Sequence, residues 1–490
     1  MTIDQRYGPY GYGEDRSTYE FPRVDWKAVN WGELQSACYK ANEASFEVPP
    51  PDLSVPRFNT QAPQAPSVKS ERQAIVLRTW STYEYHPEDY WNIRSLISEA
   101  ALETGAQYQV ILLVDVKGDE NEQIHTNETA YTEMLDQAVP PEFRNMAVLF
   151  HESLQHKWYE RVGEYKPIFQ IMQPLQLFAH FYPEFDHYWQ FEMDTRFFGH
   201  VGKMLRAFHD FGQAQPTKQS SERASWAYMP HAHGSYEDFK HNVDKGLKGG
   251  ATIWGPVEMK GVTPIGPEPP VQDPKDDNLE WGVGQDADLL IFGPLNDVRR
   301  FRAGDDWVFK GHGGFADDAP RWMAVPAQAR ASYDLLEAIH RAQHETGLQI
   351  ASEATLPSFT LWHGLKLVGL PLPKFQVPER DIWELNFVKN GGLPSQTPDG
   401  VADGPGTYRG GSFAFFSRSM TFDWWSSLCD PVFDFWMKVP YDKPKPNHEH
   451  VEYINIPNEL PWFMREVDGQ VYAPNIMMHP HKSNTYRAPE

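Results

Sequence analysis

The first half of the chain alternates short apolar runs with segments of helical periodicity. The apolar runs have the length of buried strands and cover residues 73–77, 108–114, 146–150 and 185–191. Between them, apolar residues recur at helical spacing over residues 87–105, 130–138 and 174–181. This alternation predicts a parallel sheet joined by right-handed helical crossovers. Such sheets bind ligands at the carboxyl ends of their strands, where we therefore expect the chemistry.

The N-terminal part of the chain has a different character. Residues 1–70 are rich in Tyr, Pro and Gly and include Pro49-Pro50-Pro51, a composition that favours extended backbone over helix. The apolar stretch 24–31 is long enough to dock on a neighbouring surface. We therefore expect residues 1–70 to form an extended arm packed on the body, and residues 71–490 to form one α/β domain. Two Pro- and Gly-rich stretches predict long loops, residues 261–274 and 391–411.

Charge and composition narrow the class of partner. The chain has 490 residues, with 44 Lys and Arg against 67 Asp and Glu, a net charge of −23. Nucleic acid or an anionic membrane surface calls for a basic protein surface instead. No apolar run approaches the ~18 residues of a membrane span, and the N-terminus lacks the pattern of a signal peptide. These features predict a soluble, cytoplasmic protein without a transmembrane segment. The alternative compartment is the lumen of the secretory pathway, if the natural protein carries an anchor.

Several familiar kinds of site are absent from the sequence. The only cysteines are Cys38 and Cys429, so a disulfide scaffold and a Cys-based zinc site are excluded, and two free thiols are favoured over one disulfide. Neither a Gly-x-Ser-x-Gly elbow nor a His-Glu-x-x-His helix occurs. His231 and His233 lack a nearby third ligand and are expected to be ordinary loop residues.

The sharpest chemical feature is an acidic pair at the end of the fourth strand. Glu192 and Asp194 are two positions apart, so in extended backbone their side chains project together. Paired carboxylates can hold a hard divalent cation, which in turn can bind a diphosphate. The chain has no P-loop or Gly-x-Gly-x-x-Gly cradle, and a metal is the natural substitute. The alternative is a solvated turn, or an ion pair with Arg196.

Residues at the ends of the first two strands could contact a nucleotide. Arg78, Thr79 and Trp80 follow the first apolar run, and Asp115 follows the second, where it could bind a base or a ribose hydroxyl. The alternatives are an ion-paired arginine and an aspartate that caps a turn. Tryptophans elsewhere, including Trp424, Trp425 and Trp436, could supply flat faces for a sugar, although most tryptophans belong to the core.

The order of these parts resembles that of GT-A glycosyltransferases. In that class a first strand contacts the nucleotide, three or four β/α units follow, and an Asp-x-Asp motif comes next. Glu192-Met193-Asp194 is similar to this motif, with Glu in the first place. The resemblance implies a GT-A-like fold, in which residues 71–200 form the nucleotide-sugar half and residues 201–490 form the acceptor half.

Two further stretches extend this resemblance. Ser352-Glu353-Ala354, followed by residues 364–371, is similar to an acidic motif at a helix start and the Gly-x-Lys strand after it, where inverting members keep their catalytic base. The usual pattern is Glu-Asp; Ala354 stands in the second place here, which leaves Glu353 as the only carboxylate. Residues 477–482 are similar to a terminal segment whose histidine completes the metal site, which implies His479 as a ligand.

Five short strings resemble a large family of uncharacterised fungal proteins with glycosyltransferase-like folds. The strings are Val76-Leu-Arg-Thr-Trp80, Asn92-Ile-Arg-Ser-Leu-Ile-Ser-Glu99, Glu192-Met-Asp-Thr-Arg196, Glu280-Trp-Gly-Val-Gly284 and Ala287-Asp-Leu289. The resemblance covers roughly residues 20–490 of the chain. Many members begin with a membrane anchor, which this sequence lacks.

Together these resemblances imply a metal-dependent glycosyltransferase. It would move a sugar from a UDP- or GDP-sugar to a hydroxyl acceptor, which could be a glycan, a lipid or a small natural product. Glu192, Asp194 and His479 would hold Mn²⁺ or Mg²⁺ against the diphosphate. Glu353 would deprotonate the acceptor if the reaction inverts the anomeric carbon, the favoured stereochemistry. The alternatives are a GT-A-shaped binding or scaffold protein that has lost its chemistry, and a metal-dependent hydrolase of phosphate esters.

Overall fold

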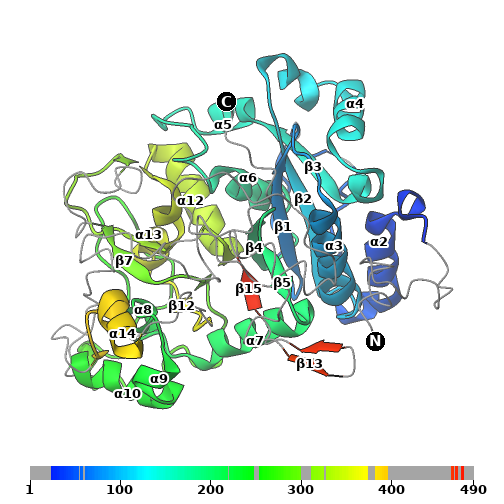
Figure 1. The fold of residues 1–490 in the computed structure, drawn as a ribbon. Helices are drawn as coiled ribbons and strands as arrows, with labels where there is room; N and C mark the ends of the chain where they lie inside the picture. The colour runs from blue at the N-terminus through cyan, green and yellow to red at the C-terminus, as the bar shows by residue number, and fades with distance from the viewer. Residues whose placement is uncertain are drawn as a thin grey trace, which may run out of the picture.

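The structure is a computed structural model, and its central feature is a seven-stranded sheet between two layers of helices (Figure 1). It describes residues 24–54, 56–58, 61–218, 220–247, 253–298, 311–324, 327–372, 381–394, 465–467, 470–472 and 476–478. The prediction of an α/β fold with a mainly parallel sheet is confirmed.

The strand order of the central sheet is β12-β6-β10-β4-β1-β2-β3. Its strands are β1 (Gln73–Trp80), β2 (Tyr108–Val116), β3 (Ala147–His151), β4 (His187–Glu192), β6 (Leu289–Ile291), β10 (Ala329–Ser332) and β12 (Leu367–Gly369). The strands β1 to β4 are mutually parallel, and β10 runs antiparallel to both β4 and β6. Since β12 is parallel to β6, six of the seven strands end at the same edge of the sheet.

The helices connect and cover these strands. They are α2 (Trp31–Asn42), α3 (Pro87–Ser95), α4 (Glu128–Ala138), α5 (Glu152–Trp158), α6 (Gln173–Phe181), α7 (Val201–Ala214), α8 (Ser220–Ala224), α9 (Pro230–His233), α10 (Tyr236–Leu247), α12 (Tyr333–Thr346), α13 (Thr355–Trp362) and α14 (Ile382–Asn390). A π-helical segment, η4 (Leu96–Leu102), continues α3. The 3₁₀ turns are η2 (Trp26–Ala28), η3 (Glu43–Ser45), η5 (Asp119–His125), η6 (Pro141–Met146), η7 (Pro274–Asp276) and η9 (Ser352–Ala354).

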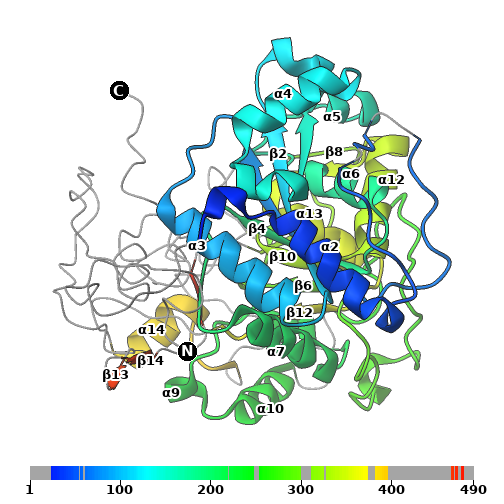
Figure 2. The same ribbon diagram turned by 90° about the vertical axis from the view of Figure 1, so that its right-hand side faces the viewer.

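Side chains alternate along β1 between two separate cores. Ala74 and Val76 belong to the core that contains residues of α6, α12 and α13. Ile75 and Leu77 belong to the core that contains residues of α3, η4 and α7. All four side chains are almost completely buried, as expected for a parallel strand that is covered on both faces. The sheet therefore forms the middle of three layers (Figure 2).

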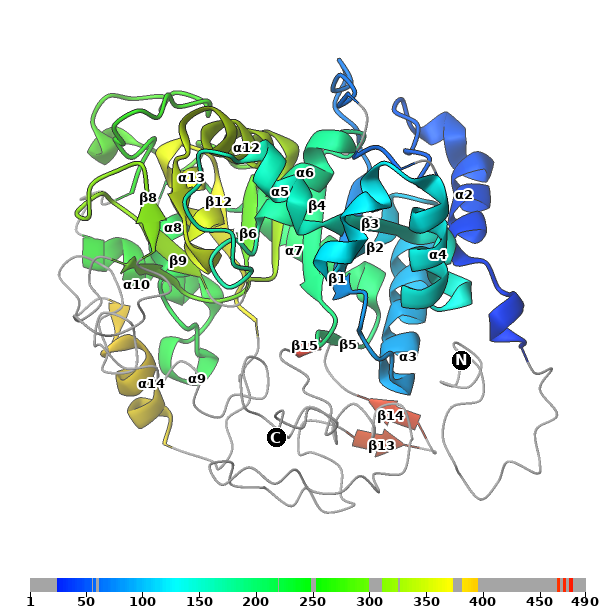
Figure 3. The same ribbon diagram turned by 90° about the horizontal axis from the view of Figure 1, so that it is seen from above.

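Among the described residues, four small two-stranded sheets lie outside the central one. They pair β11 (Gln349–Ile350) with β8 (His312–Gly313), β7 (Leu295–Asp297) with β9 (Trp322–Ala324), β13 (Arg465–Val467) with β14 (Gln470–Tyr472), and β15 (Ile476–Met478) with β5 (Arg196–Phe198). The last pair joins the C-terminal region to the segment that follows β4 (Figure 3). The C-terminal region therefore reaches the carboxyl edge of the central sheet.

The predicted N-terminal arm differs from expectation, because residues 31–42 form helix α2 rather than extended backbone. Asn30 begins the helix, and its side chain accepts a hydrogen bond from the Glu33 backbone N–H. The helix is fixed to the body by Gln35, whose side-chain amide donates to the Val110 carbonyl (3.1 Å) and accepts from the Val110 N–H (2.7 Å). Exchanging both bonds with β2 makes α2 part of the helical layer.

Three smaller expectations concern loops, spans and thiols. Residues 261–273 form an irregular loop, as predicted, and of the second predicted loop only residues 391–394 are described. Within the described ranges, no helix is both long and apolar enough to cross a membrane. Cys38 is a half-buried free thiol, and Cys429 lies outside the described residues.

Candidate functional site

The candidate site lies where the strand order reverses at the carboxyl edge of the sheet. From β1 the chain proceeds to β2 and β3 on one side, whereas β4 pairs with β1 on the other side. The register places Arg78 of β1 opposite Glu192 of β4, and Trp80 of β1 opposite Asp115 of β2. A crevice outside the strand ends at such a reversal is the usual ligand site of an open α/β sheet.

Arg78 is the central cation of this site. Burial lowers the pKa of its guanidinium, whereas the negative charges of Glu192, Asp115 and Glu353 raise it, in that order of size. Its Nη1 atom is buried and has no hydrogen-bond partner within the described part of the chain. An arginine remains protonated in such surroundings, so this N–H group is available to an anionic ligand.

Asp115 offers an acceptor beside Arg78. One of its carboxylate oxygens, Oδ2, accepts a hydrogen bond from the Lys117 ammonium group. The other, Oδ1, is buried and makes no hydrogen bond to any described residue. Burial raises the pKa of this carboxyl, and the bond from Lys117 lowers it in part. The free oxygen suits a donor such as a ribose hydroxyl.

Thr79 and Trp80 take different positions from each other. Alternation along β1 turns Thr79 to the opposite face from Arg78, and Thr79 is only 3 % exposed. Trp80 shares the face of Arg78, is half-buried, and packs edge-on against Tyr83 with 4.7 Å between ring centroids. Between Thr79 and Trp80, the geometry favours Trp80 as a donor contact, because its half-buried ring lies on the face that carries Arg78.

The acidic pair lies on a turn rather than on continuous strand. The strand β4 ends at Glu192, and the Thr195 N–H donates to the Glu192 carbonyl at 3.0 Å, which closes a turn over Met193 and Asp194. Glu192 and Asp194 are both half-buried, while Met193 and Thr195 are buried. The extended geometry assumed for the pair is therefore wrong, although both carboxylates still lie at the end of β4.

A buried amide holds one of these carboxylates. Gln328, which is fully buried just before β10, donates from Nε2 to Glu192 Oε2 and to Thr195 Oγ1, both at 3.2 Å. The Gln328 side chain thus joins the carboxylate to the turn that follows it. This contact could not be predicted from the sequence, because residue 328 is far along the chain and a single glutamine carries no motif.

Arg196, two positions after Asp194, has its own buried partner. Arg196 Nη2 and Asp89 Oδ1 of α3 lie 2.6 Å apart, and both side chains are almost fully buried. The charge of Asp194 also raises the pKa of Arg196, but Asp89 has the larger effect. In β5, Arg196 pairs with Met478 of β15. His479, the predicted third ligand, is the next residue in sequence and lies outside the described residues.

Glu353 belongs to η9, the 3₁₀ turn that leads directly into α13. It is only 6 % exposed, and the Ser352 hydroxyl donates to its carboxylate. Ser352 has a left-handed backbone (φ 57°), which is costly for a residue with a side chain and is typical of functional sites. The negative charge of Glu353 raises the pKa of Arg78, so η9 lies near the carboxyl end of β1.

The strand after this turn lies at the far edge of the sheet, as β12. Lys366, just before β12, is 4 % exposed and donates from Nζ to the carbonyls of Gly282 (2.7 Å) and Gln285 (2.8 Å). Burial lowers the pKa of Lys366 to about 8. Gly282 has a φ of 84°, and a Cβ atom there would lie 2.1 Å from Thr217 Oγ1, so only glycine fits. Lys366 therefore fixes the loop that contains Gly282.

A second group of possible metal ligands lies at the opposite edge, where β4 begins. The ligand atoms of Asp186, His187 and Asp286 lie within 4.8 Å of one another. However, Asp286 already pairs with His209 (Nε2 to Oδ1, 2.7 Å) and with the buried Arg330 (Nη2 to Oδ2, 3.3 Å). Burial alone would raise the pKa of Asp286, but these two partners hold it well below its usual range. His209 and Arg330 already supply the positive charge that a metal ion would bring, so we assign Asp186, His187 and Asp286 a structural role.

The two histidines that were expected in a loop lie on the short helix α9 instead. His233 is buried; its Nδ1 accepts from the Met229 N–H (3.0 Å), and its Nε2 lies 3.1 Å from Asn386 Oδ1 of α14. Both ring nitrogens are therefore occupied, and His231 is exposed.

The three tryptophans proposed as sugar platforms, at positions 424, 425 and 436, lie outside the described residues.

Comparison with known proteins identifies the family. A model for a protein of unknown function, DUF3405, matches residues 2–483, and the chain therefore belongs to this family. No curated protein and no solved structure matches the chain.

Proposed function

We propose that this protein is a metal-dependent glycosyltransferase of the GT-A type, which transfers a sugar from a nucleoside diphosphate sugar to a hydroxyl acceptor. One observation carries the proposal. A buried arginine at the end of β1 lies among carboxylates from the end of β2, the end of β4 and the turn before α13. This arrangement combines an anion-binding group, a candidate cation site and a candidate base in one crevice.

The donor half is formed by residues of β1 and β2. Arg78 would donate from Nη1 to a phosphate oxygen, because this N–H group has no partner among the described residues. Asp115 would accept from a ribose hydroxyl through Oδ1, which is also buried and without a described partner. Trp80, which lies opposite Asp115 in the sheet, would add an aromatic ring beside them. Leaving both polar atoms unpaired costs stability, and a ligand that pairs them recovers that cost.

The cation site would be formed by Glu192 and Asp194, with His479 as a further ligand by resemblance. Half-buried carboxylates fit Mn²⁺ or Mg²⁺, which prefer oxygen ligands. When bound, such an ion neutralises the charge that develops on a departing diphosphate. Gln328 would keep the Glu192 carboxylate in position through its 3.2 Å hydrogen bond.

Glu353 is the candidate base for the acceptor hydroxyl. Its carboxylate accepts from Ser352, and its negative charge acts on Arg78. In an inverting reaction, it would take the proton as the acceptor oxygen bonds to the anomeric carbon and the diphosphate leaves.

Donor binding can be measured without knowing the acceptor. We expect UDP- or GDP-sugars to raise the melting temperature of the wild-type protein in the presence of Mn²⁺ but not in EDTA. Asp194→Asn should remove the stabilisation by donor and metal. Asp136→Asn is the matched control, because Asp136 is exposed on α4 and pairs with Arg144 away from the crevice. Wild-type stabilisation in Asp194→Asn, or stabilisation of the wild type in EDTA, would overturn the metal role.

The base is tested by a second variant. Glu353→Gln keeps the shape of the side chain and removes the charge, so we expect turnover of a nucleotide-sugar to fall at least a hundredfold, with donor binding nearly unchanged. Donor binding without turnover in the wild type would favour the alternative of a binding protein. Unchanged turnover in the variant would remove Glu353 as the base.

A further inference from the structure

A recess opens at the carboxyl ends of β6 and β12, on the acceptor side of the sheet. It is lined by residues that follow these strands, including Phe292, Leu370 and Leu372, and by residues of α8, of α10 and of the segment between α8 and α9. The strands β4, β6 and β12 run in the same direction, so the recess and the carboxylates of the crevice lie at the same edge. With about 4.8 Å between strands, the recess begins about 10 to 14 Å along the sheet from β4.

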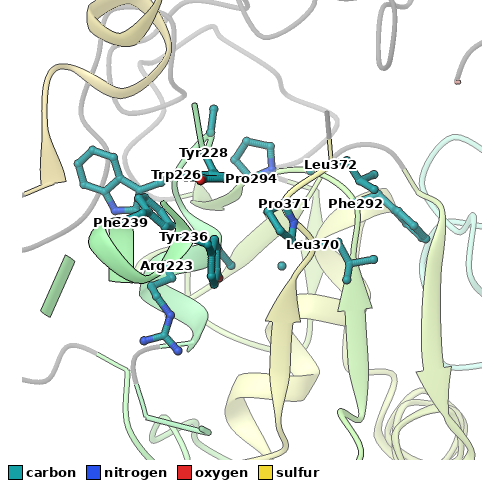
Figure 4. Close-up of a pocket in the computed structure, with 14 residues that line it drawn as sticks. Arg223, Trp226, Tyr228, Tyr236, Phe239, Phe292, Pro294, Leu370, Pro371 and Leu372 are labelled. Carbon is teal, nitrogen blue, oxygen red and sulfur yellow. The ribbon is translucent and has the colours of Figure 1, made fainter. Parts of the chain in front are cut away.

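Aromatic rings form one wall of the recess. The side chains of Trp226, Tyr228, Tyr236 and Phe239 gather on one side, and Leu370 and Leu372 lie on the other (Figure 4). The three rings of Tyr228, Tyr236 and Phe239 pack against one another, with centroids 5.2 to 5.6 Å apart. This packing makes the wall rigid, as is typical of sites for flat apolar groups.

The hydroxyl groups of the two tyrosines in this wall are already hydrogen-bonded, whereas Arg223 Nε and Nη2 are buried without a partner among the described residues. The Tyr228 hydroxyl donates to the Gly234 carbonyl at 2.8 Å, and the Tyr236 hydroxyl is hydrogen-bonded to Arg223. The guanidinium of Arg223 points away from the other lining side chains (Figure 4), and its Nη1 lies 3.6 Å from Asp244 of α10. The rings themselves therefore offer no free hydroxyl to a ligand, and their faces suit an apolar group better than a sugar ring.

The recess is also small. It holds about 470 Å³ of empty space counted out to its open mouth, and the centre of a water molecule can move within only about 30 Å³ of that space. These dimensions suit one ring at the mouth and exclude a whole oligosaccharide.

We propose that the recess binds an aromatic ring of the acceptor, so that the acceptor is an aryl compound whose reacting hydroxyl is directed along the sheet toward β4. This inference rests on the proposed function for the identity of the second substrate, but not for the binding itself. An aryl glycoside combines these parts, with its ring in the recess and its sugar hydroxyls directed toward the end of β4.

Binding of two probes tests the proposal directly. Titration calorimetry should show that 4-nitrophenyl glucoside binds at least about tenfold more tightly than methyl glucoside, which lacks the ring. Ala227→Phe fills the recess from the aromatic wall, and Leu372→Phe narrows it from the β12 side. Each variant should remove the preference for the aryl probe. Trp383→Ala is the matched control, because Trp383 is 54 % exposed on α14 and lies outside the recess.

The outcomes separate this inference from the proposed function. Equal affinity for the two probes, or an unchanged preference in both filled variants, would overturn the aryl site even if donor and Mn²⁺ bind as expected. Loss of aryl binding in the filled variants, with donor stabilisation intact, would support it. Aryl binding without any donor stabilisation would retain the recess as a site and refute the glycosyltransferase.

Discussion

The buried histidine His340 on α12 should make the protein lose stability in mild acid. It is 2 % exposed, its Nδ1 lies 3.0 Å from the Tyr159 hydroxyl, and its ring stacks on His180 of α6 at 4.1 Å. Burial lowers the pKa of His340 to about 3, and the positive charge of His180 acts in the same direction. The other titratable or charged neighbours are Glu337, Arg341 and His344, all on α12.

The direction of the effect follows from proton binding. An ordinary histidine has a pKa near 6.5, so between that pH and about 3 the unfolded chain binds a proton at residue 340 that the folded chain does not bind. The contribution of His340 to the free energy of unfolding is therefore fully present above about pH 6.5 and is lost as the pH falls. The two pKa values correspond to a loss of about 2 kcal/mol in the free energy of unfolding between pH 7 and pH 5.

The test compares how much the free energy of unfolding falls between pH 7 and pH 5 in each protein, because replacing a core residue also changes the stability at any single pH. His340→Asn keeps an acceptor near the Tyr159 hydroxyl and cannot be protonated. Urea unfolding, followed by tryptophan fluorescence at pH 7 and pH 5, should show a loss about 2 kcal/mol smaller in the variant than in the wild type. His231→Asn, at an exposed position, controls for removal of an imidazole and should keep the wild-type difference. Equal losses in His340→Asn and the wild type would refute the reasoning.

Two further predictions concern buried contacts. Arg94 donates two hydrogen bonds to the Glu142 carboxylate (2.9 and 2.6 Å), and Glu142 also accepts one from the Trp31 side chain of α2. In a urea titration, Glu142→Ala should therefore lower the free energy of unfolding by about 3 to 5 kcal/mol. A loss below 1 kcal/mol would show that the pair is solvated. Gln328→Leu should raise the Mn²⁺ concentration needed for donor stabilisation about tenfold or more, and Gln328→Asn should raise it less. An unchanged Mn²⁺ requirement in Gln328→Leu would show that Gln328 has a purely structural role.

The first four strands of the sheet were predictable because each is a run of apolar residues covered by helices on both faces. The predicted runs and β1 to β4 coincide to within a few residues. Of the remaining strands of this sheet, β6 and β10 were not visible in the sequence because they are only three or four residues long, whereas β12 lies within residues 364–371, where the resemblance implied a strand. The strand β10 even contains Arg330, a fully buried charge that pairs with Asp286. Their pairing depends on contacts between distant segments, which periodicity does not record.

Helix α2 was missed for a different reason. The composition of residues 1–70 was averaged over segments that behave differently, although Asn30 followed three residues later by Glu33 is a local sign of a helix start. The candidate site was easier, because Arg78, Asp115 and Glu192 follow strand ends that the apolar runs define. The turn that carries Asp194 and the contact from Gln328 needed the structure, since both depend on how the chain folds after β4.

The charge of the crevice gives the net charge of −23 a specific consequence. Arg78 faces three carboxylates, from Asp115, Glu192 and Glu353, and Lys117 pairs with only the first of them. A diphosphate that entered alone would add negative charge to a site already in excess of it. Repulsion between charges a few ångströms apart is substantial in a partly buried site, where solvent screens it weakly. A nucleotide-sugar should therefore bind here only together with a divalent cation, so the expected metal requirement follows from electrostatics as well as from the acidic motif.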